Sequence, residues 1–172
     1  MERMYTRRID YLRTLRHLLP HYRAENILYF DESGFEETAF NPYARAPRDQ
    51  KIYANKVGNH KKNRVNLIMA HRRKQWLAPV LFTGSCDHKM VEYWLENHLF
   101  KELQQPSLII ADNAPFHRKS KLIELCQKYG HRMLFLPPYS PDLNPIEHDF
   151  GTIKRKRYHQ TLDLILGNSY FE

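Results

Sequence analysis

Three carboxylates have the types and positions that two-metal phosphodiester chemistry requires. Asp31 and Asp112 each follow a short apolar run that predicts a buried strand, and Glu147 stands near the start of a predicted helix. This chemistry needs carboxylates that converge on one site and leave coordination positions for phosphate and water. Open α/β sheets place such sites at the carboxyl ends of strands. Either aspartate alone is equally well explained as the start of a turn.

Glu147 also has an alternative role as a helix cap. Asn144 as N-cap, Pro145 in the first turn and Glu147 form a capping box, which by itself favours capping over metal binding. The helix that follows has an apolar stripe that predicts docking on a sheet. The stripe consists of Ile146, Phe150 and Ile153.

The face beside this stripe carries Glu147, Gly151 and Lys154. Gly151 leaves open space one turn from the carboxylate, and Lys154 adds a cation where a phosphate could sit. Asp149 points roughly opposite Glu147, so we exclude it from the predicted site.

The elements that must position these acids follow an α/β order. We expect a helix over residues 5–19, with an apolar repeat of Ile9, Leu12, Leu15 and Leu19, and a strand over 26–31. Residues 34–57 are irregular, with a short strand or hairpin near 43–48. Strands over 65–70 and 77–82 form a predicted hairpin.

The second half of the chain alternates helices and strands. A helix over 87–103 is capped by Asp87, a strand covers 108–112, and a helix over 119–129 is closed by Gly130. A strand over 132–136 precedes the last helix. The expected inner face of the helix over 87–103 consists of Met90, Tyr93, Trp94, Asn97 and Phe100. This order predicts a mixed sheet flanked by helices, as in a ribonuclease-H-like fold, although several α/β folds share it.

Composition predicts one globular domain without a membrane segment. The chain has 172 residues, and its 42% hydrophobic content is ordinary for a folded domain. No apolar run approaches the roughly 20 residues of a membrane helix, and the first residues do not resemble a signal peptide. Cys86 and Cys126 show no pairing or metal-binding spacing, which predicts reduced thiols in a cytoplasmic protein.

The charge pattern favours a polyanionic partner. The formal net charge is +8, and the basic residues gather in four clusters. These lie within residues 3–16, 60–64, 71–74 and 154–157. A solvated basic face is the plainer interpretation of any single cluster, but four in one small domain favour nucleic acid.

Three motifs carry a family resemblance. They are YFDESGF at residues 29–35, ADNAPFH at 111–117 and LPPYSPDLNPIE at 136–147, and 34 residues separate Asp112 from Glu147. Together they resemble the DDE domain of mariner-related bacterial insertion-sequence transposases, over about residues 25–158.

The resemblance implies a ribonuclease-H-like fold with a mixed five-stranded sheet and cut-and-paste transposition. Asp31, Asp112 and Glu147 match the catalytic triad, which would hold two Mg²⁺ or Mn²⁺ ions. One ion would activate water and then a freed 3′-hydroxyl, and the other would stabilise the leaving oxygen. The implied partners are double-stranded DNA, both transposon ends and target, and further copies of the chain.

Other residues of the matched region are expected to serve as helpers. Asn113 and His117 would orient a ligand or contact phosphate, although a structural role is the leading alternative for His117. Lys154, Arg155 and Arg157 would contact DNA.

Two departures from the family pattern bear on function. Asp149 and Phe150 stand where the family usually has an aromatic pair, and residues 1–24 form a basic helical lead-in too short for the usual helix-turn-helix module. A catalytic domain would cover residues 25–160 and a short tail 161–172. We therefore expect a split-gene product, with a helix-turn-helix partner from an upstream frame, or a fragment of a decayed element.

Three functions remain open. The first is an active nuclease and strand transferase. The second is a catalytically incompetent DNA-binding remnant. The third, a ribonuclease-H-like repair nuclease, explains the fold and metals but not the motif at residues 136–147.

Overall fold

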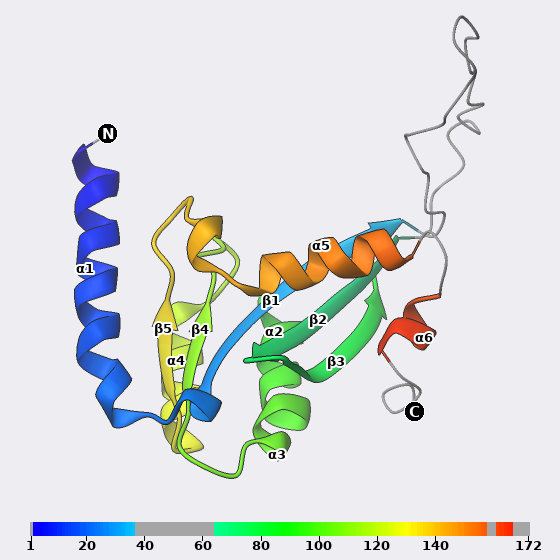
Figure 1. Cartoon of the computed structure of the whole chain (residues 1–172). Helices are drawn as coiled ribbons and strands as arrows, with labels where there is room; N and C mark the ends of the chain where they lie inside the picture. The colour runs from blue at the N-terminus through cyan, green and yellow to red at the C-terminus, as the bar shows by residue number, and fades with distance from the viewer. Residues whose placement is uncertain (1, 37–63, 158–160, 167–172) are drawn as a thin grey trace, which may run out of the picture.

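A mixed five-stranded sheet forms the centre of the protein (Figure 1). The computed structural model describes residues 2–36, 64–157 and 161–166. The strand order is β3-β2-β1-β4-β5: β2 pairs antiparallel with β3 and with β1, and β4 pairs parallel with β1 and with β5. The strands are β1 (Ile27–Glu36), β2 (Arg64–Arg72), β3 (Gln75–Thr83), β4 (Leu108–Ala111) and β5 (Arg132–Phe135). The predicted fold class is therefore confirmed.

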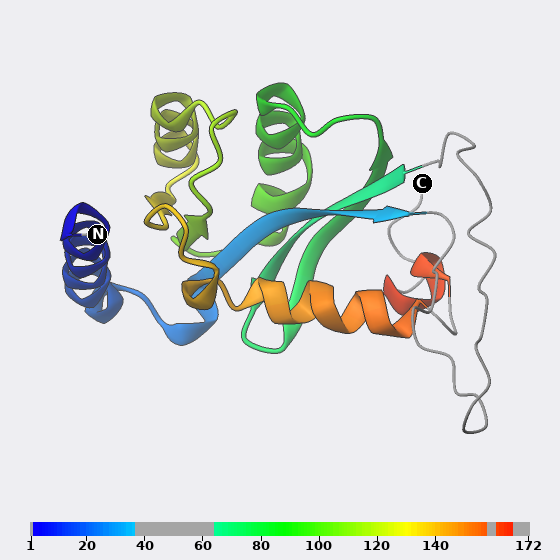
Figure 2. The same cartoon turned by 90° about the horizontal axis from the view of Figure 1, so that it is seen from above.

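Helices cover both faces of the sheet, as Figure 2 shows. On one face lie α4 (Lys119–Lys128) and α2 (His88–Trp94), which continues through a π-helical turn into α3 (Phe100–Glu102). On the other lie α5 (Ile146–Lys156) and α1 (Glu2–Leu18), and α6 (Leu162–Leu166) packs beside α5. None of these helices is both long and apolar enough to cross a bilayer.

Three buried clusters hold these layers together. The first joins Phe30 and Ile109 to Trp94 and Leu122 of the helices above them. The second packs the predicted stripe of α5 against β1 and β2, and confirms that stripe; its members include Phe35, Met69, Ile146, Phe150 and Ile153. The third places α1 against β4 and the residue after β5, through Tyr11, Leu18, Leu108, Ile110 and Leu136. Alternate residues of the strands thus serve opposite faces.

Strand β1 is longer than the sequence suggested. We expected it to end at Asp31, but it continues to Glu36 because β2 pairs with it as far as Glu36 and Arg64. Its other neighbour, β4, pairs only up to Phe30. Asp31 therefore lies inside β1, at the point where β1 loses one of its two neighbours.

The helix predicted over 87–103 forms with its cap, and part of its predicted inner face is confirmed, because Met90, Trp94 and Phe100 pack into the first cluster. The Asp87 carboxylate accepts a hydrogen bond from the Met90 N–H (2.9 Å), as expected. Tyr93 is 57% exposed, however, while Leu95 and Leu99 are buried. The π-helical turn Leu95–Leu99 inserts extra backbone per turn and rotates the buried face, which a regular 3.6-residue period cannot anticipate.

Helix α1 also buries a different stripe from the apolar repeat in its sequence. Leu12 and Leu19 are exposed, while Tyr11 and Leu18 are buried. At the other end of the chain, Gly130 ends α4 with a positive φ, as predicted. The strand or hairpin expected near residues 43–48, most of the basic cluster at 60–64 and the end of the tail lie outside the described residues.

Candidate active site

The register of the parallel strands places Asp31 beside Asp112. The last paired residues of β1 and β4 are Phe30 and Ala111, so the two aspartates are the next residues on neighbouring strands. Asp31 is 9% exposed. Its Oδ1 accepts a hydrogen bond from the Glu32 N–H (2.8 Å), and Asp112 Oδ1 accepts one from the Ala114 N–H (3.2 Å).

The chain after β5 brings the third carboxylate to the same place. The Leu136 N–H donates to the Ala111 carbonyl (2.8 Å), so this segment leaves the sheet beside Asp112. A loop then leads to Glu147 in the first turn of α5. Asp31, Asp112 and Glu147 line one cavity of about 540 Å³.

The predicted capping box is wrong. Pro145 occupies the N-cap of α5, and no side chain caps the helix. The Asn144 amide instead donates to Asp31 Oδ2 (2.9 Å). Glu147 is exposed at the cavity, where a capping bond does not hold it.

Burial and mutual repulsion dominate the electrostatics of the cavity. Burial, followed by the charges of Glu32, Asp112 and Glu147, raises the pKa of Asp31 to about 8. Burial, followed by the charge of Asp112, raises the pKa of Glu32 to about 7. Every charged side chain that acts on Asp31 is thus a carboxylate, which disfavours full ionisation of the empty cluster.

Glu32 is the acidic residue that the sequence reasoning did not select. Alternation along β1 points it away from Asp31, and it also lines a second cavity of about 450 Å³ with Gly34, Arg64 and Asn66. Because β4 stops at Ala111, no strand separates the two faces there, and Glu32 lines the first cavity as well. The signal that could have identified it is the adjacent pair of acids where a neighbouring strand ends.

The second motif contributes Asn113 and His117 in different ways. Asn113 lines the cavity, and its side-chain oxygen accepts a hydrogen bond from Lys119. His117 is buried against Phe30 and Phe116, and its Nδ1 lies 3.4 Å from Asp112 Oδ1. Burial lowers the pKa of His117, so a neutral, largely structural imidazole fits this position.

The basic residues of α5 do not join the carboxylates. Lys154 Nζ and the Arg157 guanidinium lie over the Phe35 ring, 5.7 and 5.4 Å from its centroid. Arg155 donates to the Thr152 hydroxyl (3.0 Å). None of the three lines the cavity, and their contact with a phosphate stays a prediction.

The remaining predictions for α5 are met. Asp149 pairs with His71 of β2, as its exclusion from the site requires. A Cβ added to Gly151 would meet no atom within 4 Å, so the open space predicted there exists.

A family model described as "DDE superfamily endonuclease" matches residues 26–163. The chain belongs to this family. The described coordinates also resemble solved structures of a transposase, Mos1. No curated protein sequence matches.

The structural likeness shows the ribonuclease-H-like fold of this DDE family member. The Mos1 mariner paired-end complex with Mn aligns with a TM-score of 0.76 at 19% identity, over 95% of this chain and 52% of that one. The Mos1 paired-end complex with the left transposon end aligns with a TM-score of 0.73 at 17% sequence identity, over 90% of this chain and 48% of that one. The catalytic domain of Mos1 mariner transposase aligns with a TM-score of 0.64 at 16% sequence identity, over 94% of this chain and 76% of that one. The chain thus spans about half the length of the first solved structures it matches.

The donor set of this DDE endonuclease domain fits a hard divalent cation. Carboxylate and amide oxygens suit Mg²⁺ and Mn²⁺, and two buried oxygens at the cavity, Glu32 Oε2 and Asn144 Oδ1, have no hydrogen-bond partner among the described residues. In the same part of the chain no three acidic, histidine or cysteine side chains stand close enough to hold one ion as they are. Binding therefore requires the carboxylates to draw together, which their mutual repulsion opposes until a cation neutralises them.

Proposed function

We propose that this chain is the catalytic domain of a transposase that cuts DNA strands and transfers them, with Asp31, Asp112 and Glu147 as its metal ligands. The observation that carries the proposal is the register of β1 and β4, which makes the two aspartates neighbours at the rim of a cavity that Glu147 also lines. The family supports the reaction class. Solved Mos1 complexes that contain a transposon end, Mn or Mg support the substrate and the cation.

The chain's own residues have separate tasks in this reaction. The buried Asp31 and the strand-end Asp112 would provide neighbouring ligands for the cations, and the exposed Glu147 would complete the coordination from α5 as the carboxylates draw together. Bound divalent cations would neutralise the phosphate and activate water or a 3′-hydroxyl. The cavity is open to solvent, which admits a DNA strand.

The finer steps belong to the same proposal. We infer cut-and-paste transposition on double-stranded transposon ends and target, self-association of the chain, and a helix-turn-helix partner from an upstream frame. A catalytically incompetent DNA-binding remnant is the second candidate, and the separation of the acidic side chains in the described residues favours it.

Nicking of supercoiled plasmid tests the proposal. Purified protein with Mn²⁺ is expected to nick the plasmid, and Asp112→Asn and Glu147→Gln are each expected to lower the rate at least 100-fold. Glu124→Gln is the matched control, because Glu124 is an exposed carboxylate of α4 that faces Lys121 outside the cavity. Undiminished nicking by Asp112→Asn would remove that residue from the chemistry. No nicking by the unaltered chain with either metal would favour the remnant.

A further inference from the structure

Asn144 is the most buried polar side chain that lines the acidic cavity. It is 4% exposed, and its Nδ2 donates to Asp31 Oδ2 across 113 positions of sequence. Its Oδ1 is buried and lacks a hydrogen-bond partner among the described residues. A buried amide with one bonded end and one end that lacks a partner in the described part of the chain needs an explanation.

The local sequence assigns Asn144 a different task from the one it performs. Asn is among the best N-cap residues, and the segment has the pattern of a capping box. Yet α5 begins without any side-chain cap, because the amide is turned toward Asp31. A protein that departs from a favourable local arrangement in this way usually does so at a functional site.

The geometry around Asp31 shows what this arrangement achieves. Its Oδ1 accepts the Glu32 N–H and its Oδ2 accepts the Asn144 amide, so donors fix both oxygens. Each carboxylate oxygen has two lone pairs, so one on each oxygen stays available to a cation. The rotation of the carboxylate is therefore set before any ion arrives.

The same bond also links two of the proposed ligands. Asn144 directly precedes the first turn of α5, which carries Glu147, and its amide ties this point of the chain to β1. Loss of the amide would free the Asp31 carboxylate and loosen the distance between Asp31 and Glu147.

We propose that Asn144 is a positioning residue of the metal centre: its amide N–H orients the Asp31 carboxylate and ties it to the chain segment that leads into α5. This inference rests on the proposed function. It predicts that Asn144 acts on cation affinity more than on the maximal rate. Hydrogen-bond partners of metal ligands typically change affinity or activity 10- to 100-fold when removed.

Two substitutions test the role of the amide. Asn144→Ala removes the side-chain amide entirely. Asn144→Ser keeps a small polar side chain at this position, but its hydroxyl is too short to reach Asp31, and because Pro145 is the N-cap of α5 neither variant removes a helix cap. Asn97→Ala is the matched control, because Asn97 is an asparagine outside the cavity whose side-chain amide donates to the Tyr93 carbonyl instead of a carboxylate.

Calorimetric titration with Mn²⁺ and the Mn²⁺ dependence of nicking provide the test. Both Asn144 variants are expected to bind Mn²⁺ about 10- to 100-fold more weakly and to need correspondingly more Mn²⁺ for half-maximal nicking. Their rate at saturating Mn²⁺ should stay within about threefold of the unaltered protein, whereas a purely structural lesion would lower that rate. Asn97→Ala should match the unaltered affinity.

The outcomes separate this inference from the proposed function. If the unaltered protein binds no Mn²⁺, the proposed metal centre fails. If the unaltered protein binds Mn²⁺ and Asn144→Ser binds it equally well, the positioning role is overturned while the metal centre stands. A fall in the saturated rate with unchanged affinity would likewise reject positioning.

Discussion

Replacing Asp31 with asparagine is expected to stabilise the metal-free protein at alkaline pH. The folded protein raises the pKa of this carboxyl from 3.8 to about 8, chiefly through burial and then through neighbouring carboxylates. A raised pKa means that the folded state binds the proton more tightly than the unfolded chain does. The stabilisation is therefore complete below about pH 4 and is lost as pH rises toward 8.

The size of the effect follows from that difference in pKa. Each pKa step corresponds to about 1.4 kcal/mol, so ionising Asp31 at high pH destabilises the folded state by at most roughly 6 kcal/mol. Glu32 remains charged and buried beside it, so the substitution relieves only part of the repulsion, about 3 kcal/mol. For a chain of this size that is a rise in Tm of roughly 6 to 12 °C near pH 9.

Thermal unfolding between pH 4.5 and 9 in a chelator measures this prediction. Asp31→Asn should unfold at a higher temperature than the unaltered protein at pH 9, and the two curves should converge toward pH 4.5. Millimolar Mn²⁺ should stabilise the unaltered protein at pH 9 and leave the variant nearly unchanged. If the variant is no more stable than the unaltered protein at pH 9 without metal, then burial and the neighbouring carboxylates do not destabilise the fold through the ionised Asp31.

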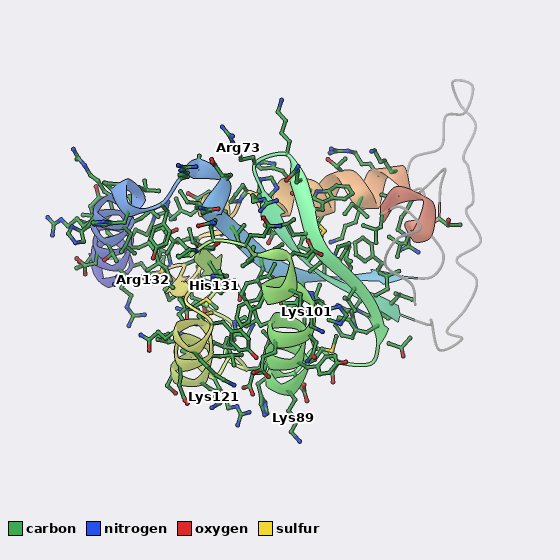
Figure 3. The ribbon with its side chains drawn as sticks, turned by 90° about the horizontal axis from the view of Figure 1, so that it is seen from below. Arg73, Lys89, Lys101, Lys121, His131 and Arg132 are labelled. Atoms are coloured by element: carbon green, nitrogen blue, oxygen red, sulfur yellow. The ribbon has the colours of Figure 1, made fainter. Side chains whose placement is uncertain are left out.

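Two further predictions concern the DNA surface and the core. Arg73 projects from the surface at the β2–β3 turn (Figure 3). Substituting Arg72, Arg73 and Lys74 with alanine should weaken DNA binding, measured by fluorescence anisotropy, and should reduce the slope of log affinity against log salt concentration by about 2 to 3. An unchanged slope would exclude the turn from the DNA interface. Phe150 is fully buried between α5 and the sheet, so Phe150→Ala would leave a cavity there. This variant should lower the free energy of unfolding, measured in urea, by about 3 to 5 kcal/mol. A loss below about 1 kcal/mol would contradict tight packing at this position.

Local sequence patterns predicted the scaffold and the acids well. Short apolar runs ending in Asp31 and Asp112 located two sheet-centre strands, and the spacing of Ile146, Phe150 and Ile153 predicted the docked face of α5. These features depend on neighbours in the sequence and on burial, so periodicity reveals them.

Features that depend on distant partners were missed. Asn144 was expected to cap its own helix, but its partner Asp31 lies more than a hundred residues away. Glu32 was set aside by strand alternation, and it reaches the cavity only because β4 is shorter than β1. The π-helical turn after Trp94 shifts the buried face of the helix, and a sequence pattern with a period of 3.6 residues does not predict this shift.

The packing of α1 changes how a shortened version of the protein should be designed. Arg8 bonds Ser140 and Asp142 in the loop that leads to Asn144, while Tyr11 and Leu18 cover the strands beneath. Trimming the gene to residue 25 would expose the apolar side chains that α1 covers and would remove the bonds from Arg8 to the loop before α5. A recombinant product meant to retain activity should therefore keep the whole first helix, even though the family match begins only after it.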